Sequence, residues 1–275
     1  MNRSIRNSLF LTAAVIDTML AILYPTNPAN PSRMRFRQFP VFLVLIAILD
    51  GCSRSGVDKM PDFSGFPEGT PRKEAFINYL SPLVVKVNEE ISKERQRTLK
   101  LEQKGNLTLA QRAWLRKLAK RYRFKEFDPV NPDWRSLLKR VDTIPPSIVL
   151  AQSANESAWG TSRFAREGNN YFGQWCFTTG CGIVPENRGS GKKHEVARFD
   201  NPTDSVRSYI MNINSHRAYR ELRAIRETLR KENEAVTGIA LAAGLSRYSE
   251  RGQEYIDELK AMIRFNDLES LDQAG

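Results

Sequence analysis

Hydrophobic residues recur every three or four positions through most of the chain after residue 72. This spacing is typical of amphipathic helices that bury one face. Several of the expected helices begin at recognisable start signals, such as the capping box formed by Thr108 and Gln111. The expected helices start at Lys73, Thr108, Asn131, Pro145, Ser162, Asn201, Thr237 and Tyr255. The chain is therefore expected to be mainly helical.

Strand-like residues gather in one region, within residues 176–199. Three short runs there, 176–179, 183–184 and 195–199, are separated by glycine-rich turns. Residues 189–193 read GSGKK, which is typical of a flexible hairpin tip. The pattern predicts a mainly α (α+β) fold in which a helical domain carries a small β-hairpin lobe.

The helix that begins at Pro145 differs from the others because its apolar stripe ends in a carboxylate. Ile148, Gln152 and Glu156 follow one another at helical spacing, and Gly160 is the expected stop. Glu156 thus lies in the last turn, where the negative end of the helix dipole raises a carboxyl pKa. A carboxyl with a raised pKa is suited to general acid catalysis near neutral pH.

The residues around Glu156 suit a sugar-binding site better than a plain surface. Residues 151–160 read AQSANESAWG, which combines small residues, amides, a carboxylate and a tryptophan. Gln152 and Trp159 are the expected substrate contacts in this stretch. The alternative is that Glu156 is an ordinary solvated glutamate near a helix end.

The first part of the chain has the pattern of an export segment, assigned to residues 1–51. Residues 39–49 read FPVFLVLIAIL, which is short for a membrane span and follows several arginines. The sequence ILDGC then resembles a lipoprotein processing box, with Cys52 as the lipidated residue. Asp50 departs from the usual small residue, so an uncleaved anchor is the alternative, and Met34 is an alternative start.

A flexible linker is expected at residues 52–72, because this stretch is rich in glycine, proline and serine and has no periodicity. Together with lipidation it predicts a protein tethered in the cell envelope or periplasm. Ser53 after the lipidated cysteine favours the outer membrane by analogy.

Cys176 and Cys181 lie five residues apart in a loop that also contains Gly180 and Gly182. In an oxidising compartment this pair predicts a disulfide. A metal site that includes His194 is the alternative, but two thiols and one imidazole are fewer ligands than the four of a typical structural zinc site. Neither a metal nor an organic cofactor is expected.

The formal net charge is +11, and five basic and two acidic residues lie in residues 1–51, so the rest carries about +8. An exported basic protein is expected to meet anionic peptidoglycan or phospholipid head groups. Nucleic acid is not an expected partner, because the basic residues are dispersed among glutamates without a reading motif. The oligomeric state cannot be read from the sequence.

Residues 151–160, together with NYFG at 170–173, resemble a known signature, AQAALESGWG…NLFG. It belongs to the bacterial peptidoglycan N-acetylglucosaminidases of glycoside hydrolase family 73, and the Bax-type proteins are especially similar. The resemblance covers about residues 145–265. It implies a lysozyme-like domain at 128–268, preceded by a helical extension at 73–127, with Glu156 as the catalytic acid.

The same resemblance implies further site residues. Asn170 and Tyr171 would line the substrate groove, and Tyr248 matches the first tyrosine of the family block GYATDPxY. Here that block reads RYSERGQEY, which departs from the family between its two tyrosines. A second acid is expected in the β lobe, with Glu186 favoured over Glu195 by its spacing to Phe199.

The resemblance therefore implies an endo-β-N-acetylglucosaminidase that cleaves β-1,4 bonds of peptidoglycan glycan strands. One alternative is a lytic transglycosylase, which would need no second acid. Another alternative is a non-catalytic wall-binding lipoprotein. The presence of both Glu156 and Tyr248 argues against it.

Overall fold

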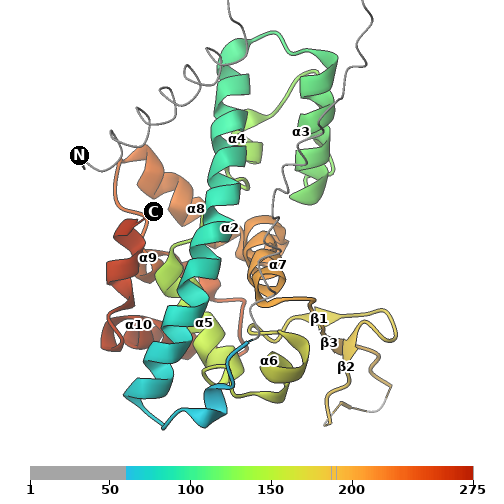
Figure 1. Cartoon of the computed structure of the whole chain (residues 1–275). Helices are drawn as coiled ribbons and strands as arrows, with labels where there is room; N and C mark the ends of the chain where they lie inside the picture. Colours follow the sequence, from blue (N-terminus) through green and yellow to red (C-terminus); the bar gives the residue numbers. More distant parts are fainter. Residues whose placement is uncertain (1–59, 187, 190, 275) are drawn as a thin grey trace, which may run out of the picture. The chain divides into compact units, whose positions relative to one another are not determined.

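The computed structural model describes residues 60–186, 188–189 and 191–274. The predicted export segment, Cys52 and the first part of the predicted linker, up to residue 59, lie outside the described residues. The described part is mainly helical and carries one small antiparallel sheet (Figure 1), which confirms the predicted fold class. None of its helices combines the length and the apolar character that a membrane span requires.

The longest helix, α2 (Thr70–Lys104), joins two hydrophobic clusters. Its C-terminal half lies beside α3 (Leu109–Arg121) and α4 (Trp134–Leu138), as Figure 1 shows. The predicted capping box opens α3, because Thr108 and Gln111 each accept a hydrogen bond from the other's backbone. The N-terminal half of α2 contributes Phe76 and Leu80 to the main core, so the described residues form one compact unit.

The end of the predicted linker is packed rather than flexible. A short 3-10 helix, η1 (Phe63–Gly65), places the Phe63 ring fully inside the core against Phe76. A Cβ atom on Gly160 would lie 2.3 Å from the Phe63 ring, so glycine is needed for this contact. One buried aromatic residue produces no periodicity, which is why the sequence pattern does not reveal it.

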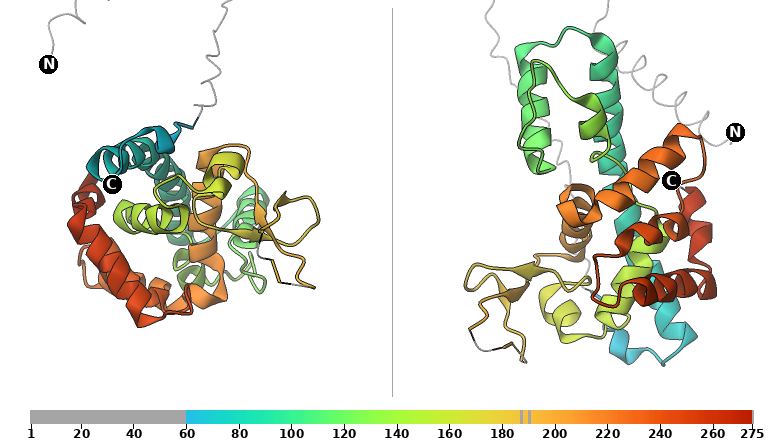
Figure 2. Two further views of the ribbon diagram at one scale, coloured as in Figure 1. Left: turned by 90° about the horizontal axis from the view of Figure 1, so that it is seen from below. Right: turned by 180° about the vertical axis from the view of Figure 1, so that it is seen from behind.

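Helix α5 (Pro146–Ser157) lies at the centre of the main core, with other helices around it (Figure 2). It contacts α2, α9 (Gly238–Ala242), α10 (Gln253–Phe265) and η4 (Leu268–Ala274). Asp272 accepts hydrogen bonds from both the backbone N–H and the hydroxyl of Ser147. A carboxylate at this end complements the helix dipole, and so η4 fixes the start of α5.

The other end of α5 comes earlier than the predicted stop at Gly160. Ala158 adopts a left-handed conformation with φ of 50°, and Trp159 and Gly160 also have positive φ. The Ser157 hydroxyl accepts from the Gly160 N–H at 2.8 Å and donates to the Ser153 carbonyl at 2.6 Å. The Ser157 side chain supplies hydrogen bonds to backbone groups that have no partner at the end of the helix. A residue other than glycine, Ala158, is therefore tolerated as the cap.

The remaining helices frame the core and the sheet. They are α6 (Arg163–Gly168), α7 (Pro202–Ser215), η2 (Arg217–Tyr219), α8 (Arg220–Lys231) and η3 (Ala243–Leu245). The sheet consists of β1 (Trp175–Cys176), β2 (Gly182–Ile183) and β3 (Glu195–Ala197) in the order β1-β3-β2. Val196 pairs with both Trp175 and Ile183, so β3 is the central strand of the predicted β lobe.

Candidate active site

Glu156 lies in the last turn of α5, where its side chain is accessible to solvent. Its Oε1 accepts a hydrogen bond from the Tyr255 hydroxyl at 3.0 Å. The surrounding protein still displaces enough water to raise the pKa of this carboxyl, while the Tyr255 bond lowers it and the Glu258 charge raises it. The predicted direction of the shift is therefore confirmed, with burial as its main cause.

A chain of hydrogen bonds from buried side chains holds the Tyr255 hydroxyl in place. Gln152, one helical turn before Glu156, donates from Nε2 to Tyr255 Oη at 3.0 Å. The other amide atom, Gln152 Oε1, accepts from the Tyr209 hydroxyl. Gln152 is fully buried, so the prediction that it contacts the substrate is wrong. It holds Tyr255, which in turn orients Glu156.

Tyr248 lies beside this chain, as the resemblance implied. Its ring stacks on Tyr255 with centroids 5.4 Å apart, and its hydroxyl donates to the Phe172 carbonyl at 3.5 Å. Burial is the main cause that raises the pKa of Tyr209, Tyr248 and Tyr255. These phenols therefore stay protonated at neutral pH and act as hydrogen-bond donors.

The segment 170–173 borders Glu156, which the resemblance also implied. A Cβ atom on Gly173, where φ is 61°, would lie 3.9 Å from Glu156 Oε2. The glycine therefore leaves space next to this oxygen. Oε1 is taken by Tyr255, so Oε2 is the oxygen that is free to face a substrate.

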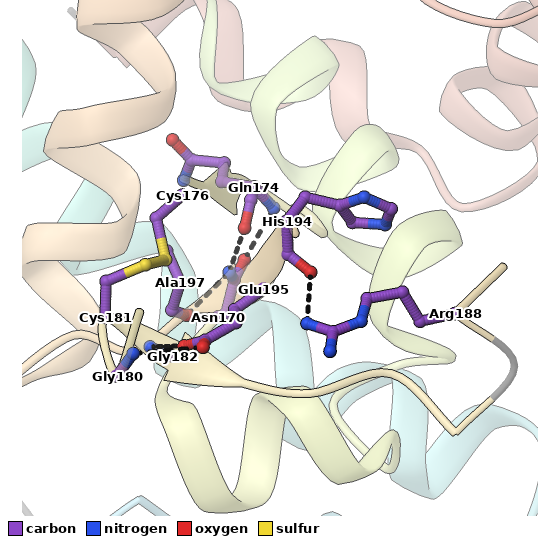
Figure 3. The surroundings of a disulfide bond; sticks show 10 residues. All are labelled: Asn170, Gln174, Cys176, Gly180, Cys181, Gly182, Arg188, His194, Glu195 and Ala197. Atoms are coloured by element: carbon purple, nitrogen blue, oxygen red, sulfur yellow. Dashed lines mark hydrogen bonds between the residues drawn. A yellow bond between two sulfur atoms is a disulfide. The ribbon is translucent and has the colours of Figure 1, made fainter. Parts of the chain in front are cut away.

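Asn170 and Tyr171 do not line the groove as predicted. Asn170 is buried and donates to the Gln174 and Ala197 carbonyls (Figure 3). Its Oδ1 accepts from the backbone N–H groups of Phe172 and Gln174. Its amide thus ties the start of the β lobe to β3. Tyr171 is fully buried against Phe76, so it is part of the core.

Glu195 is a structural residue rather than a second acid. Its two oxygens accept from the backbone N–H groups of Gly180 and Gly182 at 3.0 and 2.8 Å (Figure 3). These hydrogen bonds lower the pKa of the carboxyl. The side chain is 5% exposed, so it cannot reach a substrate as predicted.

The predicted disulfide between Cys176 and Cys181 is present, with Cα atoms 6.2 Å apart. It closes the same loop that Glu195 holds (Figure 3). The two sulfur atoms and a Glu195 oxygen lie within 4.8 Å of one another. However, the sulfurs are bonded to each other and Glu195 is engaged with amides, so this arrangement favours the disulfide over the metal alternative.

The other two predicted site residues have different surroundings. Glu186 follows β2, is 79% exposed and forms an ion pair with Arg163 at 3.5 Å. Trp159 is partly buried, with its ring against Phe76 and the Lys73 ammonium 5.2 Å from the ring centroid. These contacts show that Trp159 packs against the core, while its contact with the substrate stays a prediction.

Tyr255 is a functional residue that the sequence pattern did not reveal, because the pattern indicates only that a helix begins there. It is 2% exposed, and its hydrogen bonds are made inside the protein. Two signals pointed to it. It is the second tyrosine of the block that contains Tyr248, and the polar Gln152 on an apolar helix stripe requires a buried partner.

Residues 131–268 match the glucosaminidase family, described as mannosyl-glycoprotein endo-beta-N-acetylglucosaminidase. The chain therefore belongs to the glucosaminidase family and is a glycoside hydrolase of the endo-β-N-acetylglucosaminidase type. It is 38% identical to Protein bax of Escherichia coli strain K12 over 208 residues, which are 75% of this chain and 74% of that protein. These matches confirm the resemblance found in the sequence.

A solved structure is also similar, the catalytic domain of the autolysin Auto from Listeria monocytogenes. It is 17% identical, and the match covers 76% of this chain and 92% of that one with a TM-score of 0.42.

Proposed function

We propose that this glucosaminidase hydrolyses peptidoglycan glycan strands after N-acetylglucosamine, with Glu156 as the general acid. The hydrogen bond from Tyr255 to Glu156 carries the proposal, because it orients a carboxyl whose pKa is raised by burial. A protonated carboxyl at neutral pH is what departure of a sugar oxygen requires. The positive charge of the chain suits an anionic wall polymer.

In the proposed reaction, Glu156 transfers its proton to the glycosidic oxygen as the bond from that oxygen to C1 breaks. Tyr255 occupies Oε1, so the proton is transferred from Oε2, next to Gly173. Water then adds to the oxocarbenium-like C1 and gives its proton to a base. Tyr248, which stacks on Tyr255, is proposed to bind the acetamido group of the sugar.

The second acid is proposed to be Glu186, because Glu195 is held by backbone amides. Glu186 is exposed on the β lobe, paired at the surface with Arg163, and would position water beside a bound strand. The acetamido oxygen of the substrate is the alternative group for supporting C1. A Glu186→Gln variant distinguishes the two mechanisms. It should lose activity if Glu186 positions the water, and it should keep activity if the acetamido oxygen supports C1.

We also propose that the protein is exported and anchored through a lipid on Cys52. The Cys176–Cys181 disulfide supports export, because such bonds persist in oxidising compartments. In cell fractionation, the wild type should sediment with membranes and Cys52→Ser should become soluble. Equal sedimentation of both proteins would contradict the anchor.

Mass spectrometry of purified peptidoglycan digested by the full-length protein tests the proposed reaction. Fragments with reducing-end N-acetylglucosamine are expected. Anhydro-muramic products would instead identify a lytic transglycosylase, and intact strands that retain bound protein would indicate a wall-binding role.

A further inference from the structure

A positively charged cavity of about 280 Å³ lies among residues of α2, α4, α8 and the segment after α4. Its lining reaches Asp142, four residues before α5 begins at Pro146, whereas Glu156 lies at the other end of that helix. Twelve helical residues span about 18 Å. The cavity is therefore separate from the candidate active site.

The charged residues of this cavity are strongly unbalanced. Seven cationic side chains line it and only two carboxylates do, Asp142 and Glu227. The cations are Arg95, Arg135, Lys139, Arg223, Arg226, Arg230 and Lys231.

Each of the two carboxylates is shared among three cations. Asp142 accepts two hydrogen bonds from Arg230, at 2.6 and 2.7 Å, and lies 3.4 Å from Arg226 and 3.5 Å from Arg95. Asp142 is 3% exposed, so its carboxylate is largely desolvated. A single negative charge cannot neutralise three guanidinium groups, and a positive excess remains.

Glu227, on the rim of the cavity, is likewise one carboxylate shared among three cations. It pairs with Arg135 at 2.6 Å, Lys139 at 2.9 Å and Lys231 at 3.1 Å. Hydrogen bonds from these cations lower the pKa of Glu227 to about 2. The rim therefore carries a positive excess like that of the interior.

Arg223 has no carboxylate partner among the described residues, although it is only 3% exposed. Its Nη1 donates to the carbonyls of Ile213 and His216. Burial and then the neighbouring charges of Arg140 and Arg226 lower its pKa to about 10, and Arg226 is lowered similarly. A buried cation without a carboxylate beside it is costly, so Arg223 adds to the positive excess of the cavity.

We propose that this cavity binds a phosphate group, supplied by a small phosphorylated molecule or by a phospholipid head group. Guanidinium groups bind phosphate oxygens in a two-pronged geometry, and five arginines line this cavity. A doubly charged anion would offset more of the excess than a carboxylate does. The cavity is large enough for a phosphate with its substituent.

Calorimetric titration of the full-length protein with pyrophosphate tests the proposal. The cavity variant replaces two exposed rim cations, Arg135→Gln and Lys231→Gln, whose ion pairs contribute little to folding. Its matched control, Arg116→Gln with Lys117→Gln, removes the same charges from the exposed face of α3. The cavity variant should bind about tenfold more weakly, because it loses charge-assisted hydrogen bonds.

The control variant should bind pyrophosphate as the wild type does. Equal weakening of both variants would show non-specific attraction and overturn the proposal, as would a lack of any binding to pyrophosphate or to vesicles. Sedimentation with phosphatidylglycerol vesicles, compared with phosphatidylcholine vesicles, distinguishes the two sources. Binding to pyrophosphate alone identifies a small molecule, and cavity-dependent binding to the anionic vesicles identifies a lipid.

Discussion

The carboxyl group of Glu156 is subject to two opposing influences. Burial disfavours the charged form and raises its pKa, while the hydrogen bond from Tyr255 favours the charged form and lowers it. Tyr255 itself is held by Gln152, which is fixed by Tyr209. Tyr255 is thus a positioning residue that also limits how far the pKa of Glu156 rises.

Replacement of Tyr255 with Phe should raise the pKa of Glu156 further. The general acid then stays protonated to higher pH, so the alkaline limb of the pH–rate profile should shift to higher pH. The rate should also fall about tenfold, because one orienting hydrogen bond to a charged group is lost. The measurement is the pH dependence of glycan cleavage.

Tyr122→Phe is the matched control for this prediction, because Tyr122 donates to Glu94 at 3.1 Å within the α2–α3 cluster. Its pH profile should match that of the wild type. If Tyr255→Phe lowered the rate without moving the alkaline limb, a purely structural role would be indicated.

The sequence located the candidate site but did not assign all of its side chains correctly. Glu156 and Tyr248 could be placed because each falls in a block of residues that resembles a family motif. Gln152, Asn170 and Tyr171 belong to the same signature, yet they support the site from inside the core. A signature contains both substrate contacts and supporting residues, and burial is what separates them.

At the scale of elements, the fold of the β lobe is stabilised by a disulfide and side-chain hydrogen bonds rather than by long strands. Its strands have only two or three residues, so few ladder hydrogen bonds form. The Cys176–Cys181 disulfide and the bonds from Gly180 and Gly182 to Glu195 hold the loop instead. The lobe is therefore sensitive to the charge state of Glu195.

Replacement of Glu195 with Gln should lower the melting temperature at neutral pH. The folded-state pKa of Glu195 is lowered, so its contribution is present above the ordinary value of 4.5 and is lost as the pH falls through the lowered value. Melting curves of wild type and variant should converge in acid. Glu186→Gln, an exposed carboxylate of the same lobe, is the control and should change little.

Helix starts were more predictable than helix ends. The side chains of Thr108 and Thr237 cap α3 and α9 at the positions that the sequence indicates. The end of α5 could not be predicted, because it depends on the Ser157 hydroxyl and on three consecutive residues with positive φ. Local start signals are in the sequence, whereas this end is stabilised by its surroundings.

At the scale of the molecule, the segment before α2 belongs to the same core as the candidate active site. Phe63 packs on Phe76, and Phe76 packs on both Trp159 and Tyr171. This aromatic cluster joins η1, α2 and the two segments that flank α6. Contacts between segments so distant in the sequence have no periodic signal, so the boundary of the linker could not be predicted correctly.

Replacement of Phe63 with Ala should destabilise the whole folded unit by about 3–5 kcal/mol, the usual effect of removing a buried phenyl ring. Phe66→Ala is the control, because Phe66 is 37% exposed and should have a smaller effect. Urea unfolding followed by circular dichroism measures both. Equal and small effects would mean that η1 is not part of the core.

The rate of peptidoglycan cleavage by Glu156→Gln at neutral pH tests most directly whether Glu156 is the general acid. Glutamine keeps the shape of the side chain and its hydrogen bond with Tyr255 but cannot donate an acidic proton. We predict that the cleavage rate falls by about 10²- to 10⁴-fold while strand binding is retained. Cleavage by Glu156→Gln at the wild-type rate would contradict the assignment of Glu156 as the general acid.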